Sequence, residues 1–464
     1  MGRYAIIMAA GKGTRMKSSR EDISKVSFPI LGKPMVGYVL DALKGLNLDR
    51  IVTIVGFGGE MTKSIVEKDS EVVWQKEQKG TGHAVMMASD ILSEEEGETI
   101  ICCGDTPLLT GKTLSALLSS HETNHNDLTL MTAIFEDPHG YGRIVKKNGR
   151  VVKIVEQKDC SIEEDTIHEV NAGVYVFNNK ELFKDLKRLT PNNAAGEYYL
   201  TDVISMFVKD GKKVDSFAVS DAKETMGVND RYNLSKAEKI IRHRINKKWM
   251  LAGVSMDDPD TTYIGPDVKL SQDCVIRPNT MILGNSRLGK GNVVGPNSYL
   301  ENVEVGENNV IEYSHITDSS IGNGNNLGPF LRVRQNCVIE NNIHLGNFNE
   351  LKNVTIKDDT WCMHLSYLGD ADIGKNVNIG CGSIIANYDG VNKTHSSIGD
   401  NAFIGSGTIL ISPITVGESS FTGAGSVINK DVSSHDFAIA RARQENKEGY
   451  ADTLKEKALK KASK

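Results

Sequence analysis

The sequence predicts an α/β domain with a Rossmann-like, mostly parallel sheet, followed by a left-handed parallel β-helix of hexapeptide repeats. Strand-like and helix-like segments alternate over residues 1–229, which is typical of a parallel sheet covered by helices on both faces. Over residues 250–437 an aliphatic residue returns at every sixth position, a period that neither an α-helix nor a half-buried strand has. A chain of 464 residues is long enough for two or three domains.

The α/β domain is expected to form its first strands at residues 4–10, 50–56, 71–75 and 99–103. Helices are expected between or after them, at residues 34–46, 81–92 and 112–121. Ligands of such sheets bind beyond the carboxyl ends of the strands, so these ends are where we expect a functional site.

The six-residue period predicts a chain that turns a corner after each short strand, with the aliphatic residue pointing into a narrow core. An amphipathic helix is expected at residues 231–250, so the predicted domains are 1–229, a helical linker at 230–250 and the β-helix at 251–464. The lysine-rich tail at 451–464 is expected to be a mobile end. The first run of aliphatic positions is Ile264, Leu270, Ile276, Ile282, Leu288, Val294 and Leu300.

Composition and charge exclude several classes of protein. A net charge of −6 argues against general nucleic-acid binding, and no apolar run is long enough to span a membrane. The seven cysteines are scattered singly except for Cys102 and Cys103, which we expect to be a buried, inert pair. His121, His125, His139 and His435 form no ligand cluster and are expected to be solvated. The sequence therefore predicts a soluble, cytoplasmic protein.

A glycine-rich loop follows the first predicted strand and contains Gly11, Lys12, Gly13 and Arg15. It is neither a Walker P-loop, because Gly-Lys-[Ser/Thr] is missing, nor a dinucleotide fingerprint, because Met16 occupies the third glycine position. Glycines after a strand let backbone N–H groups face an anion, and the two cations add charge where a triphosphate would lie. Taken alone, the loop could also be a basic surface turn.

The loop belongs to a longer series of motifs that resembles the sugar-phosphate nucleotidyltransferases. With the hexapeptide repeats attached, the chain resembles the bifunctional GlmU family, whose members join an N-acetylglucosamine-1-phosphate uridyltransferase to a glucosamine-1-phosphate N-acetyltransferase. The motifs are Gly11–Met16 with Lys25, Gln75, Gly80-Thr81-Gly82-His83-Ala84, Gly104-Asp105-Thr106-Pro107, Gly140-Tyr141-Gly142-Arg143, Glu156-Gln157-Lys158, Asn171-Ala172-Gly173 and Gly227-Val228-Asn229.

The resemblance implies a first site that transfers a uridylyl group from UTP to N-acetylglucosamine 1-phosphate. Arg15 and Lys25 would neutralise phosphate charge, and Asp105 and Asn229 would bind Mg²⁺, which needs few protein oxygens. Ser24 and Cys103 depart from the family pattern without removing a charged group. The implied substrate contacts are Met8, Ala9, Ala10 and Gly11 at the uracil and ribose, Gln75, Gly80 and Thr81 at the base, Gly142, Glu156 and Asn171 at the sugar, and also Lys25, Cys103, Gly104, Asp105 and Asn229.

A second site is expected where the six-residue phase breaks, near residues 361–370 and 387–397. The resemblance implies acetyl transfer from acetyl-CoA to glucosamine 1-phosphate, with His364 as the base, because histidine accepts a proton near neutral pH. Met363, Gln335-Asn336 and Cys381 depart from the family pattern near this site. The implied sugar-phosphate contacts are Arg334, Lys352, Tyr367 and Asn378, and the implied acetyl-CoA contacts are Cys381, Asn387, Tyr388, Ser406, Ala424 and Arg441.

The sequence leaves two other hypotheses open. The β-helix could be a trimerisation scaffold whose acyl site has decayed, which would leave only the uridyltransferase. A sugar-nucleotide sensor without turnover is the weaker alternative, because mere binding does not require the pair Asp105 and Asn229. The resemblance also implies a homotrimer in which neighbouring β-helices complete each acetyl site.

Overall fold

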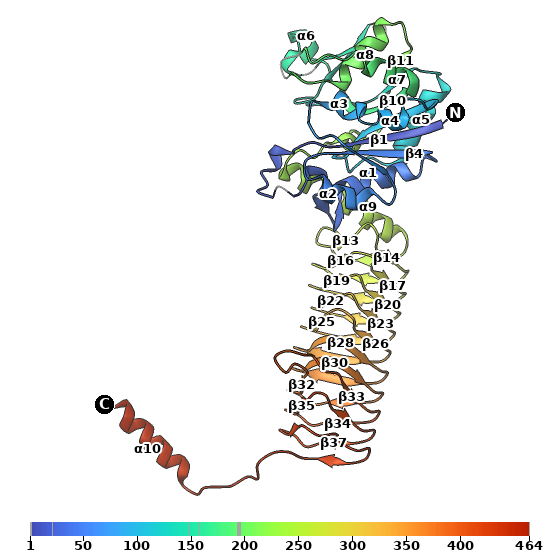
Figure 1. Ribbon diagram of the computed structural model, residues 1–464. Coiled ribbons are helices and arrows are strands. Elements are labelled where there is room, and N and C mark those ends of the chain that lie inside the picture. The colour runs from blue at the N-terminus through green and yellow to red at the C-terminus, as the bar shows by residue number, and fades with distance from the viewer. Residues whose placement is uncertain (1, 21, 148, 156, 193–195, 464) are drawn as a thin grey trace. The chain divides into compact units, whose positions relative to one another are not determined.

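The structure is a computed structural model that describes residues 2–20, 22–147, 149–155, 157–192 and 196–463. The chain forms two compact units, Met1–Ile245 and Asn246–Lys464, and the division falls within helix α9 (Arg231–Leu251). The first unit is an α/β domain and the second is a ladder of short strands (Figure 1).

The first unit is built on a nine-stranded sheet in which β1 lies between β4 and β6. The pairs β1–β4, β1–β6, β4–β5 and β7–β11 are parallel, whereas β10 runs antiparallel to β6 and β7. The predicted mostly parallel sheet is therefore confirmed. The strands are β1 (Gly2–Ala9), β4 (Arg50–Val55), β5 (Glu71–Trp74), β6 (Gly97–Cys103), β7 (Leu128–Ile134), β8 (Arg143–Lys147), β9 (Arg150–Val155), β10 (Glu169–Asn178) and β11 (Val214–Ala218).

Helices cover both faces of this sheet, because alternate residues of the strands point to opposite sides. Ile6 packs in one buried cluster with Val85 of α3 and Phe207 of α8, while Ile7 packs in another with Val39 of α1. The expected helix at 81–92 is divided in two at residues 87–88. The helices are α1 (Met35–Lys44), α2 (Gly59–Val66), α3 (Thr81–Met86), α4 (Ser89–Leu92), α5 (Gly111–Thr123), α6 (Ile162–Asp165), α7 (Asn179–Leu186) and α8 (Leu200–Lys209).

The second unit is a parallel β-helix, as predicted. Its strands run from β12 (Ser255–Met256) to β39 (Phe437–Ala438) and stack in parallel register, so that Ile276 lies opposite Val294 on the next coil. The hexad residues fill the core, and Ile276, Ile282 and Val294 have no exposed surface. Each aliphatic side chain therefore lies above the equivalent residue of the coil before it.

The six-residue phase changes on both sides of the first predicted break. Leu351 and Ile356 are buried five residues apart, and so are Leu368 and Ile373. Between these changes the chain stays in the ladder, with Cys362 in the core and with β29 (Trp361–His364) and β30 (Tyr367–Ile373). At the second predicted break the chain leaves the ladder, between β32 (Ile384–Ala386) and β33 (Ser396–Ile398).

His121 is not solvated as expected. It is 1% exposed and its ring nitrogens contact Thr129 Oγ1 at 2.9 Å and Glu98 Oε2 at 2.8 Å. These partners lie on β6 and β7, and their contact with His121 depends on how the strands pack against α5, which the sequence pattern does not show. The other three histidines of that group are exposed, as expected.

All seven cysteines are free thiols. Burial raises the pKa of Cys103 to about 12 and raises that of Cys102 as well, so both stay protonated near neutral pH. Cys102 is buried as expected, whereas Cys103 is only half-buried. The lysine-rich tail forms an exposed helix, α10 (Tyr450–Ala462). Every helix that the structure describes is too short or too polar to cross a bilayer.

Candidate active sites

A cleft of about 770 Å³ opens where β1, β5 and β6 end in the first unit. Met8 and Cys103 lie at the ends of β1 and β6, and Gln75 directly follows β5. The cleft thus lies at the carboxyl edge of the sheet, where the sequence places it. Ten predicted contacts line it, namely Met8, Ala9, Ala10, Gly11, Lys25, Gln75, Gly80, Thr81, Cys103 and Asp105.

The glycine-rich loop passes directly over Lys25. Gly13 has φ of 61°, and a Cβ built on it would lie 2.5 Å from Lys25 Cβ. Only glycine fits this left-handed, close approach. Beyond it, Arg231 Nε donates to the Met16 carbonyl at 3.1 Å, which ties the end of the loop to the start of α9.

Four predicted catalytic and metal-binding residues come together beside this loop. Lys25 forms an ion pair with the Asp105 carboxylate and donates to Asn229 Oδ1 at 3.1 Å. Arg15 donates to the same Asn229 oxygen at 2.8 Å. The Val228 N–H donates to the Asp105 carbonyl at 2.9 Å and so holds residues 228–229 against the strand end. Asn229, a member of this cluster, and Gly104, next to Asp105, do not line the cleft itself.

The arrangement fits a divalent cation. The oxygens of Asp105 and Asn229 already converge on one positive charge, the Lys25 ammonium. A carboxylate and an amide oxygen are hard ligands of the kind Mg²⁺ prefers, and Mg²⁺ keeps waters and substrate phosphates as its other ligands. Among the described residues no group of three or more His, Cys, Asp or Glu side chains gathers for a metal.

Gln75, which is expected to contact the base, is held in a fixed orientation in the cleft. It is 3% exposed, its Nε2 donates to the Gly80 carbonyl at 3.2 Å, and it lies 2.9 Å from His83 Nδ1. Burial, with a smaller effect of Lys79, lowers the pKa of His83, so its neutral ring can accept the amide proton. His83 belongs to a motif noted in the sequence, but its partnership with Gln75 was not predicted.

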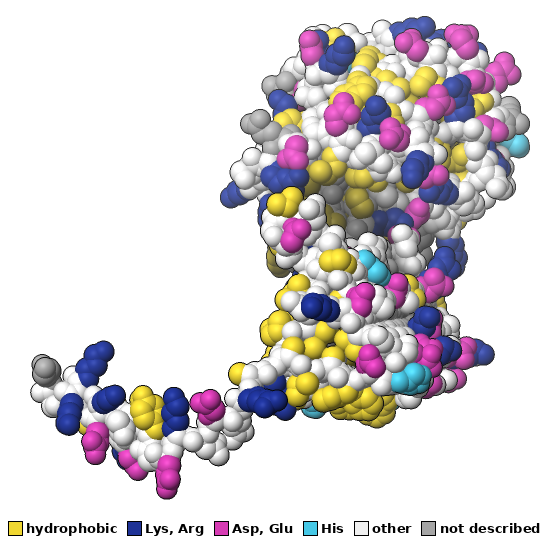
Figure 2. Space-filling view, turned by 60° about the horizontal axis from the view of Figure 1, so that its bottom comes forward, with side chains coloured by type: hydrophobic (Ala, Val, Ile, Leu, Met, Phe, Trp, Pro, Cys, Tyr) yellow, Lys and Arg dark blue, Asp and Glu magenta, His cyan; other side chains and the backbone are white. Residues whose placement is uncertain are grey.

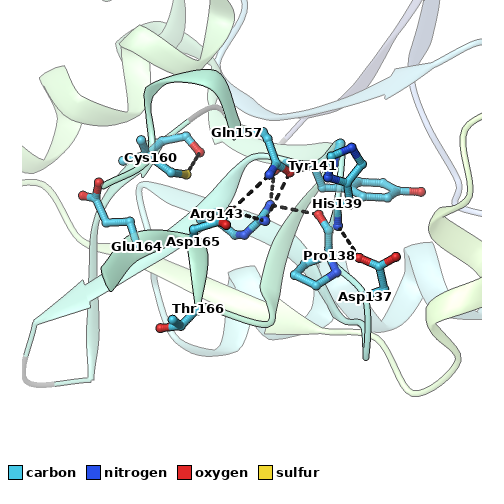
Figure 3. Close-up of polar contacts among 12 residues, drawn as sticks. Asp137, Pro138, His139, Tyr141, Arg143, Gln157, Cys160, Glu164, Asp165 and Thr166 are labelled. Atoms are coloured by element: carbon cyan, nitrogen blue, oxygen red, sulfur yellow. Dashed lines mark hydrogen bonds and ion pairs between the residues drawn. The ribbon is translucent and has the colours of Figure 1, made fainter. Parts of the chain in front are cut away.

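The predicted sugar contacts lie outside the lining of this cleft. The Asn171 N–H donates to the Gly142 carbonyl at 2.8 Å, so these two residues are neighbours. Glu156 lies outside the described residues. Beside them, the buried guanidinium of Arg143 joins the loop before β8 to Gln157 and Asp165 (Figure 3). From the sequence alone, Arg143 was identified only as a member of a motif.

In the β-helix, four predicted residues of the second site form one column along a corner. His364, Cys381, Ser406 and Ala424 occupy the same position in successive coils, as the strand registers fix. The corner beside them carries no side chains in the last three coils, because the residue that follows Cys381, Ser406 and Ala424 is a glycine: Gly382, Gly407 and Gly425. An extended ligand could therefore lie along the column below His364.

Met363 precedes His364 at a position that is glycine in neighbouring coils. Those coils need glycine at this position because the next coil is close: a Cβ built on Gly346 would lie 2.0 Å from the Met363 carbonyl oxygen, and one on Gly380 would lie 2.5 Å from the Ser406 nitrogen. Met363 is half-buried here and His364 is exposed. The methionine therefore leaves the histidine ring accessible to solvent.

Three cations gather near the predicted sugar-phosphate site. The ammonium of Lys393, with smaller effects of desolvation and of Arg334, lowers the pKa of Lys352. Lys393 lies in the excursion after β32, where it forms a β-bridge with Tyr388. Arg334 is also paired with Glu350 at 3.1 Å. Such a cluster of like charges suits a phosphate, and Lys393 was missed because it lies far from Lys352 in the sequence.

The excursion is anchored by buried polar groups. Asn387 is 5% exposed and its Nδ2 donates to Asp370 Oδ2 at 2.5 Å and to the Tyr367 hydroxyl at 3.5 Å. Tyr388, Asn378 and Arg441 are exposed, with Asn378 on β31 (Asn378–Ile379) opposite Trp361. The structure thus brings Tyr367 and Asn387 together, whereas Asn378 lies on a different face of the coil from the excursion.

Comparison with known proteins agrees with both units. The nucleotidyl transferase family matches residues 4–250, and the bacterial transferase hexapeptide family, with six repeats, matches residues 395–430. Proteins described as bifunctional protein GlmU from Exiguobacterium sibiricum, Geobacillus sp. and Enterococcus faecalis are 48%, 46% and 47% identical to this chain. In each case the match covers 97% of this chain and 98–100% of the relative. The chain belongs to the GlmU family.

Membership of the GlmU family confirms the bifunctional enzyme predicted from the sequence. The chain is a nucleotidyltransferase and an acetyltransferase of UDP-N-acetylglucosamine synthesis, and this finding favours two activities over a uridyltransferase on an inert scaffold.

Proposed function

We propose that uridylyl transfer takes place in the cleft at the ends of β1, β5 and β6. The observation that carries this assignment is the convergence of Lys25, Asp105 and Asn229 beside the glycine-rich loop. The loop and Gln75 form the nucleotide end of the cleft, and Gly142, Glu156 and Asn171 hold the sugar.

A cytoplasmic location is also proposed, in keeping with seven free thiols.

The reaction joins a phosphate oxygen of N-acetylglucosamine 1-phosphate to the α-phosphorus of UTP and releases pyrophosphate. Because both reactants are anions, the site must neutralise charge and hold them in line. When bound by Asp105 and Asn229, Mg²⁺ supplies positive charge to the phosphate oxygens. In the absence of substrate, Lys25 and Arg15 contact the side-chain oxygens of Asp105 and Asn229. Once they leave these oxygens, the two cations pair with the substrate phosphates and with the charge that develops on the pyrophosphate leaving group.

We propose that acetyl transfer takes place at the corner column of the β-helix, with coenzyme A along Cys381, Ser406 and Ala424. His364 removes a proton from the sugar ammonium, the amine attacks the thioester carbonyl, and the carbon–sulfur bond breaks to release the thiol. Asn387 and Tyr388 complete the site from the excursion, Tyr367 and Asn378 contact the sugar, and Arg441 meets a coenzyme phosphate.

An assay that follows free thiol and pyrophosphate separately tests both assignments. With acetyl-CoA and glucosamine 1-phosphate, the full chain should release thiol without pyrophosphate. With UTP and N-acetylglucosamine 1-phosphate, it should release pyrophosphate without thiol. Failure of either release by the wild-type protein would contradict the corresponding half of the proposal.

The phosphate of glucosamine 1-phosphate is proposed to bind Arg334, Lys352 and Lys393. Replacing Lys393 by Met should raise KM for glucosamine 1-phosphate by about tenfold, because charge-assisted contacts to phosphate contribute 1.5–3 kcal/mol. KM for acetyl-CoA should stay the same. Lys393 lowers the pKa of Lys352, so in the variant Lys352 keeps its proton to higher pH, and the alkaline rise in KM should begin at higher pH. Lys375→Met, which removes an exposed lysine paired with Asp358, is the control, and an equal effect there would contradict the assignment.

A homotrimer is proposed because an exposed column of apolar side chains runs along the corner of the β-helix that carries His364. Tyr313, Phe330, Phe348 and Leu365 occupy equivalent positions of successive coils and are 41%, 54%, 57% and 58% exposed. Phe330 and Phe348 stack with ring centroids 5.5 Å apart. Hydrophobic side chains cover much of the end of the β-helix that faces the viewer in Figure 2. Aligned apolar groups of this kind are typical of an interface between copies of a chain.

Replacing Phe330 and Phe348 together by Glu should convert the trimer to monomers, since it buries charge at the proposed interface. Light scattering or sedimentation measures the change. Acetyl transfer should fall with trimer content, while uridylyl transfer should persist. Ile162→Glu, at a 91% exposed position in α6, should alter neither. A wild-type chain that sediments as a monomer would overturn the proposal.

A further inference from the structure

A completely buried arginine stands at the sugar end of the first unit. Arg143 begins β8, is 1% exposed, and is among the largest fully buried side chains of the described residues. A buried guanidinium is costly unless its charge and its N–H groups are met by partners. The hydrogen-bond partners of the Arg143 guanidinium therefore indicate what this residue does.

The guanidinium joins three separate segments (Figure 3). One terminal nitrogen donates to the carbonyls of Pro138, at 2.9 Å, and Tyr141. The other donates to Gln157 Oε1 at 3.2 Å and to Asp165 Oδ1, in α6, at 3.0 Å. Nε has no partner among the described groups. The polar contacts of Arg143 therefore fix the loop before β8 against the segment after β9.

Gln157 completes the connection. Its Oε1 also accepts the Gly140 N–H at 2.7 Å, and its Nε2 donates to Asp165 Oδ1 at 3.1 Å. Gly142, between Tyr141 and Arg143, presents its carbonyl to the Asn171 N–H at 2.8 Å. Of the residues proposed to hold the sugar, Gly142 thus lies in the loop that Arg143 fixes, and Asn171 is directly bonded to Gly142.

We propose that Arg143 is a positioning residue for sugar-phosphate binding in uridylyl transfer, acting through Gly142 and Gln157 without touching the substrate. The proposal rests on the proposed function of the cleft. Arginine is required because its planar fork reaches two carbonyls and two side-chain oxygens at once, which a lysine ammonium cannot do. A shift of about 1 Å in a substrate-holding loop is enough to reduce productive binding by one or two orders of magnitude.

Two variants of the full-length protein test the proposal. Gln157→Ala removes the shared acceptor at a half-buried position and leaves Arg143 in place, and Arg143→Lys keeps the charge without the fork. Both should raise KM for N-acetylglucosamine 1-phosphate on the order of tenfold or more, with KM for UTP changed less than about twofold. A residue that only stabilised the fold would not separate the two KM values.

Lys153→Met is the matched control. It removes an exposed ion pair between β9 and Glu164 of the same α6 helix, at 2.8 Å, without touching the loop before β8, and should leave both KM values unchanged. A KM for UTP close to that of the wild type checks that the first unit of each variant has folded. Unchanged sugar KM in Gln157→Ala, or an equal rise in both KM values in both variants, would overturn the proposal. Absence of uridylyl transfer in the wild type would instead refute the proposed function.

Discussion

Asp105→Ala should abolish pyrophosphate release from UTP while leaving thiol release from acetyl-CoA intact. Asp105 supplies the carboxylate at the position where Lys25 and Asn229 converge, and without it the metal loses its charged protein ligand. We expect kcat for uridylyl transfer to fall by on the order of 10³, the range seen when a preorganised electrostatic group is removed from a transition state. This fall in kcat is measured by coupled detection of pyrophosphate over a series of Mg²⁺ concentrations.

The Mg²⁺ series separates loss of the metal ligand from loss of the fold. Asp105→Asn keeps an oxygen but not the charge, so it should recover part of the activity at higher Mg²⁺. Asp41→Ala removes an exposed carboxylate paired with Lys33 and should leave uridylyl transfer unchanged. Wild-type pyrophosphate release by Asp105→Ala would mean that the reacting phosphates bind elsewhere.

His364→Ala should abolish release of free thiol and leave uridylyl transfer from N-acetylglucosamine 1-phosphate at its wild-type rate. The sugar ammonium has no lone pair until a base removes its proton, and His364 is the imidazole at the head of the column formed with Cys381, Ser406 and Ala424. General-base catalysis contributes roughly 10²–10⁴-fold, so the residual rate should lie in that range below wild type. Thiol trapping gives the rate directly.

A pH series and a second histidine complete this experiment. Because the reaction needs an unprotonated amine, the residual activity of His364→Ala should rise with pH more steeply than that of the wild type. His315→Ala, in β22 (His315–Thr317) and outside the column, should behave as wild type. Full thiol release by His364→Ala would show that another group accepts the proton.

The fold could be predicted from the sequence because its patterns are local. A core residue at every sixth position makes the β-helix visible without any knowledge of contacts, and the alternation of segments does the same for the sheet. The pattern is harder to follow where the residue type changes. Cys362 is as buried as the isoleucines around it, but a thiol is not one of the aliphatic residues that make the period visible.

Only those residues of the candidate sites that belong to sequence motifs could be predicted. Lys25, Asp105 and Asn229 were expected together and lie together. Lys393, the partnership of His83 with Gln75, and the role of Arg143 were not, because each depends on segments brought together by folding. His121 shows the same limit in the core, since its partner Glu98 lies on a neighbouring strand.

The corner column also acts as a molecular ruler. Each coil adds one position to the column and advances it by one inter-strand spacing, about 4.8 Å, so separation along the ligand is counted in whole coils. Inserting one complete coil between Cys381 and Ser406 would leave the core pattern intact yet move Ser406 and Ala424 one step away from His364. For the coenzyme A site proposed along this column, the distance from His364 to each contact could therefore change only in steps of one coil.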